Sequence, residues 1–107
     1  MVAICDMEKR KPSYDLTTIK AALGSRETLS MTATARRAAL QLGFDAAGVV
    51  EVILSLERSM FQKSMTTYAD HRVWQDVYQA RSRNLVLYVK FQADVVTEFT
   101  VISFKEK

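Results

Sequence analysis

The chain is poor in cysteine, histidine, glycine and proline, and each shortage excludes a class of site. Its one cysteine and one histidine, Cys5 and His71, are too few for a zinc site, which usually takes several such ligands. Its three glycines stand at no phosphate-loop spacing. A nucleophilic triad would depend on His71 alone, in an expected turn where a histidine is usually a surface residue. A single cysteine forms no internal disulfide, which favours a reducing compartment.

Long apolar runs are also missing. No segment approaches the roughly 18 apolar residues that a membrane-spanning helix needs. The amino terminus, MVAICDMEKRKP, has only about four apolar residues before its first charge, too few for a signal peptide. With 107 residues, of which 49% are hydrophobic, the chain fits one globular domain. We therefore expect a cytoplasmic protein with no membrane partner.

Paired carboxylates, which a two-metal nuclease needs, are absent from the second half, where Asp70 and Asp76 lie near a turn and Asp94 is isolated. Any cutting of RNA by this chain is therefore expected to use amines, a phenol and amides, with no metal or other cofactor. RNA supplies its own nucleophile, the 2′-hydroxyl. The protein must then accept a proton, stabilise the added charge and help the 5′-oxygen leave, which lysines and tyrosines on a rigid sheet can do.

What the chain does have is a local excess of positive charge. The net charge is only +3, but six basic residues stand against two acidic ones between Arg58 and Lys90. Such an excess attracts phosphates and steers polyanions. A solvated basic surface explains it equally well, so charge permits a nucleic-acid partner without proving one.

Periodicity predicts helices in the first half and strands in the second. We expect residues 1–12 to be a loose, charged extension and residues 13–107 to be the folded domain. Capping residues and apolar spacing predict helices over residues 13–24, 32–43 and 45–56, with Asp45 as an N-cap and Phe44 stapled to Val49. Strands are predicted over residues 61–68, 72–78, 84–92 and 98–107. Helices followed by strands favour an α+β fold, an antiparallel sheet with helices packed on one face.

Alternation assigns side chains to the two faces of the sheet. In residues 84–92 it directs Leu87 and Val89 toward the helices and Tyr88 and Lys90 away from them. In the last strand Ile102 and Phe104 are expected to oppose Ser103 and Lys105. Lys63 shares its parity with Phe61 and Met65, so either Met65 also faces outward or the strand bends. We expect Trp74 and Phe104 in the core, and favour core packing for Met65 over a place in an RNA groove.

The segment FQKSMTTYADHRVWQDVY, from Phe61 to Tyr78, and the ending VISFKEK closely resemble the MqsR family. MEKRKP, from Met7, and LGFDAAGVVEVILSL extend the resemblance over nearly the whole chain, and Met7 is itself an alternative start. Members of this family are messenger-RNA interferase toxins with a RelE-like fold. The resemblance implies metal-independent cleavage of messenger RNA, free or ribosome-associated, leaving a 2′,3′-cyclic phosphate and a 5′-hydroxyl. It also implies a cognate antitoxin that contains zinc, binds DNA and represses the shared operon.

The family's catalytic positions carry over onto matching residues of this sequence. They are Lys63 in KSMTTY, Gln75 in WQDVY, Tyr88 in the third strand and Lys105 in SFKEK. We expect Lys63 and Lys105 to hold the scissile phosphate, Tyr88 to transfer a proton and Gln75 to position phosphate or base. RNA is expected to contact a further set of residues: Tyr68, Arg72, Arg81, Arg83 and Lys90. Outside a family match, strand lysines and tyrosines are usually surface or packing residues.

Two segments depart from the family pattern. The expected connection from Gln79 to Asn84 lacks the family's proline and glycine and carries extra arginines, and the stretch from Gln92 to Thr100 is longer and more divergent. These departures leave the cleavage sequence open. Two rival functions share the fold and charge: a basic module that binds RNA or a protein without cutting, and a degenerate toxin that acts only as a transcriptional co-regulator with its antitoxin.

Overall fold

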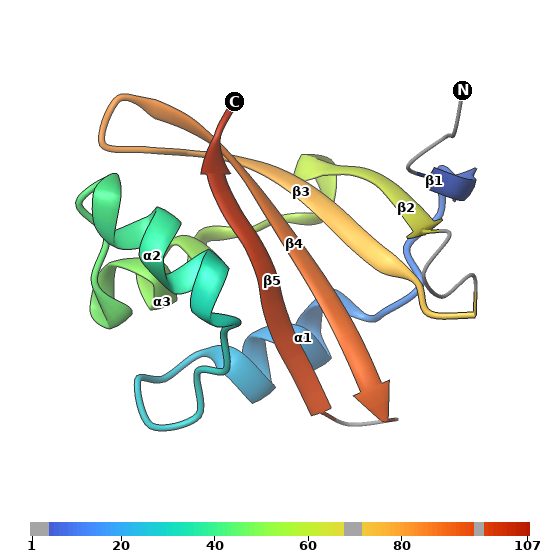
Figure 1. Cartoon of the computed structure of the whole chain (residues 1–107), viewed down its shortest axis with the longest axis horizontal. Helices are drawn as coiled ribbons and strands as arrows, with labels where there is room; N and C mark the ends of the chain where they lie inside the picture. The colour runs from blue at the N-terminus through green and yellow to red at the C-terminus, as the bar shows by residue number, and fades with distance from the viewer. Residues whose placement is uncertain (1–4, 68–71, 96–97) are drawn as a thin grey trace.

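The protein is a layer of helices on one face of a five-stranded antiparallel sheet (Figure 1). This is a computed structural model that describes residues 5–67, 72–95 and 98–107. The strands follow in sequence order across the sheet, so that β1 and β5 form its two edges. The elements are β1 (Cys5–Lys9), α1 (Leu16–Leu23), α2 (Ala33–Gln41), α3 (Ala46–Ser55), η1 (Arg58–Met60), β2 (Phe61–Thr67), β3 (Gln75–Ser82), β4 (Leu85–Val95) and β5 (Glu98–Glu106). The α+β prediction is therefore confirmed.

Each helix begins at a side chain that caps it. Asp15, Thr32 and Asp45 accept hydrogen bonds from backbone N–H groups three residues further on, at 3.0, 3.1 and 2.8 Å. These bonds satisfy donors that the first turn of a helix leaves unpaired. Gly43, with a φ of +91°, lets the chain turn sharply between α2 and α3. The predicted helices and the predicted cap at Asp45 are thus confirmed.

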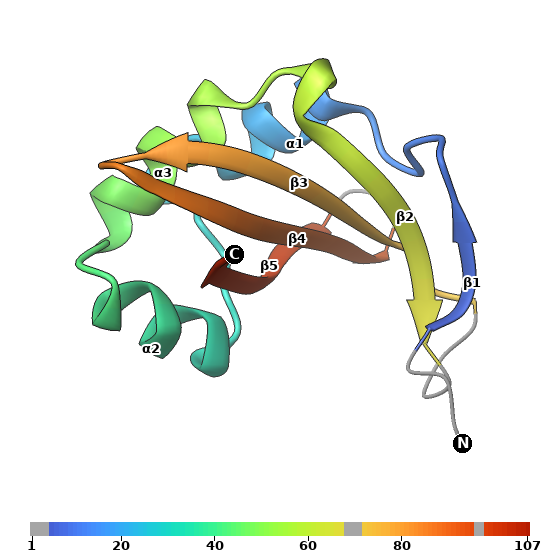
Figure 2. The ribbon, with the colours of Figure 1, turned by 90° about the horizontal axis from the view of Figure 1, so that it is seen from above.

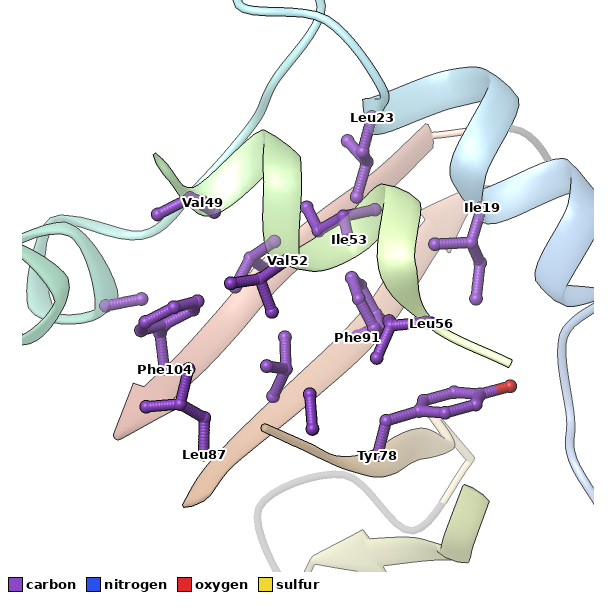
Figure 3. Packing of buried hydrophobic residues seen from close by; sticks show 14 of the residues in the cluster. Ile19, Leu23, Val49, Val52, Ile53, Leu56, Tyr78, Leu87, Phe91 and Phe104 are labelled. Atoms are coloured by element: carbon purple, nitrogen blue, oxygen red, sulfur yellow. The ribbon is translucent and has the colours of Figure 1, made fainter. Parts of the chain in front are cut away.

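The hydrophobic core lies between the helices and the sheet. Figure 3 shows Val49, Val52 and Ile53 of α3 facing the sheet, where Phe91 and Phe104 lie below them. Phe104 is fully buried, as expected, and packs its ring 5.2 Å from that of Phe44. The buried residues of β4 are Leu87, Val89 and Phe91, which confirms the alternation predicted for that strand. The opposite face of the sheet carries no helix among the described residues (Figure 2).

A buried carboxylate ties the segment before α1 to the sheet. Asp76 of β3 is fully buried and accepts hydrogen bonds from the backbone N–H groups of Ser13 and Tyr14 at 3.0–3.1 Å. Beside it, the hydroxyls of Ser13 and Ser64 lie 2.8 Å apart. The strands β2 and β3 and the chain leading into α1 are therefore joined through a small polar cluster.

The structure corrects the expectations for the amino terminus, for Trp74 and for the connection after Gln79. Cys5–Lys9, expected within a loose extension, form the edge strand β1, which pairs antiparallel with β2. Trp74, expected in the core, is only half-buried because it precedes β3, and the ammonium of Lys9 lies 4.2 Å from its ring centroid. The expected connection after Gln79 is mostly strand, since β3 continues to Ser82 and a two-residue turn at Arg83 and Asn84 has φ values of 53° and 64°.

Tyr78, a core residue, makes stability depend on pH in the alkaline range. Burial raises the pKa of Tyr78 from 10.0 to about 12, and the charges of Asp76 and Asp15 act in the same direction. Because the folded state holds the proton more tightly than the unfolded state, this contribution is fully present below pH 10 and is lost as the pH rises toward 12. We expect the unfolding free energy of the wild type to fall about 2 kcal/mol further than that of Tyr78→Phe over this range. Urea titrations of the two proteins at several pH values would measure this difference. An equal pH dependence of the two unfolding free energies would contradict the prediction.

No single described helix is long and apolar enough to cross a membrane; only α2 and α3 together, with a bend of 93° between them, have the required length and composition.

Candidate active site

A bulge in β2 sets the direction of Lys63. Phe61 pairs with Tyr78 and Lys63 with Val77, so Gln62 is an extra residue on the β2 side. Phe61 consequently faces the helices, where its ring packs 5.6 Å from that of Tyr78. Beyond the bulge, Lys63 and Met65 face the other way. Both alternatives left open by the sequence therefore apply, since the strand is irregular and Met65 also points outward.

A second bulge sets the faces of β5. Lys90 pairs with Ser103 and Phe91 with Val101, so Ile102 is the extra residue. Val101 and Phe104 therefore both lie in the core, whereas Ile102 is half-buried outside it. The expectation that Ile102 shares the helix side with Phe104 is wrong, because alternation was counted through the bulge. Lys105 pairs with Tyr88, which brings these two side chains together on the outward face.

The outward face is hollowed near its centre. We call this space, of about 580 Å³, the outer hollow. Met65 and Val77, each 5% exposed, line it together with the polar residues around them. Met65 therefore packs in the outer hollow and not in the core that we favoured for it. The residues that line the outer hollow are Glu8, Arg10, Gln62, Lys63, Met65, Val77, Tyr88, Lys90 and Lys105.

Three of the four expected catalytic residues meet in this hollow, namely Lys63, Tyr88 and Lys105. The fourth, Gln75, is paired with Met65 and lies next to the hollow on the same face. Its side-chain amide donates a hydrogen bond to the Gln92 side-chain oxygen at 3.2 Å, which orients the amide on the sheet surface. Strand pairing thus assembles residues that are 42 positions apart in the sequence, from Lys63 to Lys105.

The amino-terminal segment supplies lining residues that the sequence analysis missed. The Glu8 carboxylate pairs with the Lys63 ammonium at 2.8 Å, and the Arg10 guanidinium lies 3.4 Å from the Gln62 carbonyl oxygen, to which it donates. Both residues belong to the stretch expected to be a loose extension. Their charged sequence, MEKRKP, has no apolar alternation that would have indicated a strand.

The expected RNA-binding residues are dispersed. Lys90 lines the outer hollow. Arg81 is exposed on the same face but opposite Val86, beyond the lining residues, and Arg72 is exposed in the turn before β3. Arg83 instead fastens the β3–β4 turn to the helices, since its guanidinium lies 4.4 Å over the Phe44 ring and donates to the Gly43 carbonyl oxygen. Tyr68, together with His71, lies outside the described residues.

The charges of the outer hollow suit a phosphodiester. Its lining includes the cationic side chains of Arg10, Lys63, Lys90 and Lys105 and the phenol of Tyr88. Positive groups fixed on a sheet stabilise negative charge that develops on a phosphate, and a phenol can exchange a proton with an oxygen. Among the residues that the structure describes, no three His, Cys, Asp or Glu side chains come together in a way that could hold a metal ion.

Two comparisons with known proteins both match toxins of one kind. The sequence profile of the family described as "Motility quorum-sensing regulator, toxin of MqsA" matches residues 11–106. The chain is also 41% identical over 101 residues to the mRNA interferase toxin MqsR of Escherichia coli (strain K12), and the alignment covers 94% of this chain and 100% of that protein. The profile match includes Lys63, Gln75, Tyr88 and Lys105 and begins after Glu8 and Arg10.

Proposed function

Because the chain belongs to the MqsR toxin family, we propose that it is a sequence-selective endoribonuclease, an mRNA interferase toxin that inhibits translation by cutting messenger RNA. The observation that carries the proposal is the meeting of Lys63, Tyr88 and Lys105 in one hollow whose charged lining is mostly cationic. A cytoplasmic location follows from the substrate.

The 2′-hydroxyl of the RNA is the nucleophile in this reaction. It attacks the adjacent phosphorus, and the bond from phosphorus to the 5′-oxygen breaks, leaving a 2′,3′-cyclic phosphate and a 5′-hydroxyl. Lys63 and Lys105 stabilise the charge that builds on the phosphate oxygens. Tyr88, held opposite Lys105 in the sheet, takes part in proton transfer. Gln75 positions phosphate or base from the edge of the hollow.

Binding of the flanking RNA relies on charge outside the reacting centre. Lys90 holds a phosphate within the hollow, and Arg81 lies along the same face in a position to hold one beyond it. Arg83 is the expected RNA contact that the geometry favours least, since its guanidinium is already engaged by Phe44 and Gly43.

The partner of the toxin is an antitoxin. The family description names the toxin of MqsA, and we propose that the partner here contains zinc, binds DNA and represses the operon that it shares with the toxin. In this proposal the zinc belongs to the antitoxin, and the toxin itself cuts RNA without a cofactor.

The test is an RNA cleavage assay with mapped ends. Purified protein is incubated with a defined messenger RNA in EDTA, and the new ends are identified by ligation and mass spectrometry. We expect cutting that EDTA does not affect and a cyclic phosphate at each new 3′ end. Intact RNA that is nevertheless bound would support the non-catalytic binding module, and cutting abolished by EDTA would overturn the metal-free reaction.

A further inference from the structure

A carboxylate lines the outer hollow. Glu8, projecting from β1, is the one acidic residue among the described residues that line it, and its Oε2 lies 2.8 Å from the Lys63 Nζ. The side chains of Lys63 and Glu8 are 35% and 47% exposed, so both are accessible to a bound RNA. The ion pair joins the edge strand to the strand that carries the first proposed phosphate ligand.

The Lys63–Glu8 ion pair adds little to folding stability and does not help a polyanion to bind. Ion pairs between exposed side chains contribute little to folding because solvent screens them. In a hollow that receives a polyanion, a negative charge also opposes binding and occupies a lysine that a phosphate would use. A carboxylate beside a phosphate site does have one chemical use, the acceptance of a proton from the attacking hydroxyl.

We propose that Glu8 is the general base of the cleavage reaction, an inference that rests on the proposed ribonuclease function. The Glu8 carboxylate takes the proton of the RNA 2′-hydroxyl as the bond from the 2′-oxygen to phosphorus forms. The bond from phosphorus to the 5′-oxygen breaks, and that oxygen takes the proton of the Tyr88 hydroxyl. Exchange with water then returns a proton to Tyr88 and removes one from Glu8, so that no other reactant is consumed.

Glu8 and Tyr88 reach the hollow from different strands, as the base and the acid of an in-line displacement would have to do. The entering and leaving oxygens lie on opposite sides of phosphorus, so the base and the acid must also lie on opposite sides. Glu8 is on β1 and Tyr88 is on β4, with two strands between them at a spacing of about 4.8 Å per strand. The hollow of about 580 Å³ is lined by residues of both strands and has Met65 and Val77 beneath it.

Apart from Glu8, the ionisable groups that line the hollow are cations and one phenol, and they come from three strands and the segment after β1. They are Arg10 beyond β1, Lys63 on β2, Tyr88 and Lys90 on β4, and Lys105 on β5. A carboxylate among cations is favoured as the anion. Lys63 therefore has two uses, since it orients the base and stabilises the phosphate.

The first test compares Glu8→Gln with Glu8→Asp and with the matched control Glu51→Gln, at an exposed position of α3. We expect Glu8→Gln to lower the single-turnover rate on a defined RNA about 10²-fold or more and to lose the acidic limb of the pH profile. Glu8→Asp should recover part of the rate, and Glu51→Gln should cut as the wild type does. Binding of a 2′-deoxy version of the RNA should stay equal or become tighter in Glu8→Gln. A Glu8→Gln variant that cuts at the wild-type rate with an unchanged pH profile would overturn the inference.

A second test separates base from acid. In a substrate whose bridging 5′-oxygen is replaced by sulfur, the leaving group needs no proton. The defect of Tyr88→Phe should shrink on this substrate, whereas the defect of Glu8→Gln should persist. Rescue of Glu8→Gln by the sulfur would show that Glu8 serves the leaving group and would overturn its role as base. Wild-type protein is assayed on every substrate. If the proposed ribonuclease function is wrong, the wild type itself leaves the RNA uncut, whereas failure of the Glu8 inference appears only in the variants.

Discussion

Replacing Tyr88 by phenylalanine is expected to slow RNA cleavage about 10³-fold while leaving the fold intact. Tyr88 is half-buried in β4 opposite Lys105, and phenylalanine keeps the ring that packs there while removing only the hydroxyl. The loss should appear in the rate of the chemical step and not in affinity, since the hydroxyl acts as the bond to the 5′-oxygen breaks. Single-turnover cleavage, with affinity measured separately on a 2′-deoxy RNA, distinguishes the two.

Tyr14→Phe is the matched control for this variant. The Tyr14 hydroxyl donates to the Trp74 carbonyl oxygen at 2.7 Å and lies outside the outer hollow, so its loss should cost about 1 kcal/mol of stability and leave the cleavage rate unchanged. Combining Tyr88→Phe with Lys105→Ala should cost less than the product of the single effects, because the two residues face each other in the sheet. Wild-type cleavage by Tyr88→Phe would show that its hydroxyl transfers no proton.

Asp76→Ala is expected to be the most destabilising single polar substitution, with a loss of about 3 kcal/mol in the free energy of unfolding. The carboxylate is fully buried, and its removal leaves the backbone N–H groups of Ser13 and Tyr14 without their acceptor. The segment that connects β1 to α1 would then lose its attachment to the sheet. Urea unfolding followed by circular dichroism measures the loss, and Glu51→Ala, on an exposed face of α3, is the control with an expected change of about 0.5 kcal/mol or less.

Asp76→Asn refines the same prediction. The amide keeps the shape of the carboxylate and one of its acceptor oxygens but turns an NH₂ group toward backbone N–H donors. We therefore expect a smaller loss than for alanine. Equal stability of the wild type and Asp76→Ala would mean that the two N–H groups find water instead, and that the polar cluster at Ser13 does not secure the amino-terminal segment.

The helices were predictable because their signals are local. Asp15, Thr32 and Asp45 each lie within three residues of the N–H group that they cap, so sequence alone contains both partners of the bond. The alternation of β4 was equally readable, since β4 is an interior strand whose helix-facing side chains are buried. The edge strand β1 could not be predicted from the sequence. It is a strand because it pairs with β2, more than 50 positions away.

The site was predictable in its residues and not in its geometry. Resemblance pointed to Lys63, Tyr88 and Lys105, which the structure brings together. The direction of Lys63 depended on a bulge at Gln62, which has no signature in a glutamine between phenylalanine and lysine. Glu8 was missed because its relation to Lys63 is a contact between distant strands.

The bulges at Gln62 and Ile102 have a consequence for the length of the chain. At each bulge the strand contains one residue more than its pairing requires. The partner strand advances by one residue there, while β2 or β5 advances by two. Removing Gln62 would leave Phe61 and Lys63 as direct neighbours that already point to opposite faces, and removing Ile102 would do the same for Val101 and Ser103. A deletion elsewhere in either strand would exchange its faces. These two positions are therefore where a shorter version of this sheet would keep both its core and its cutting surface.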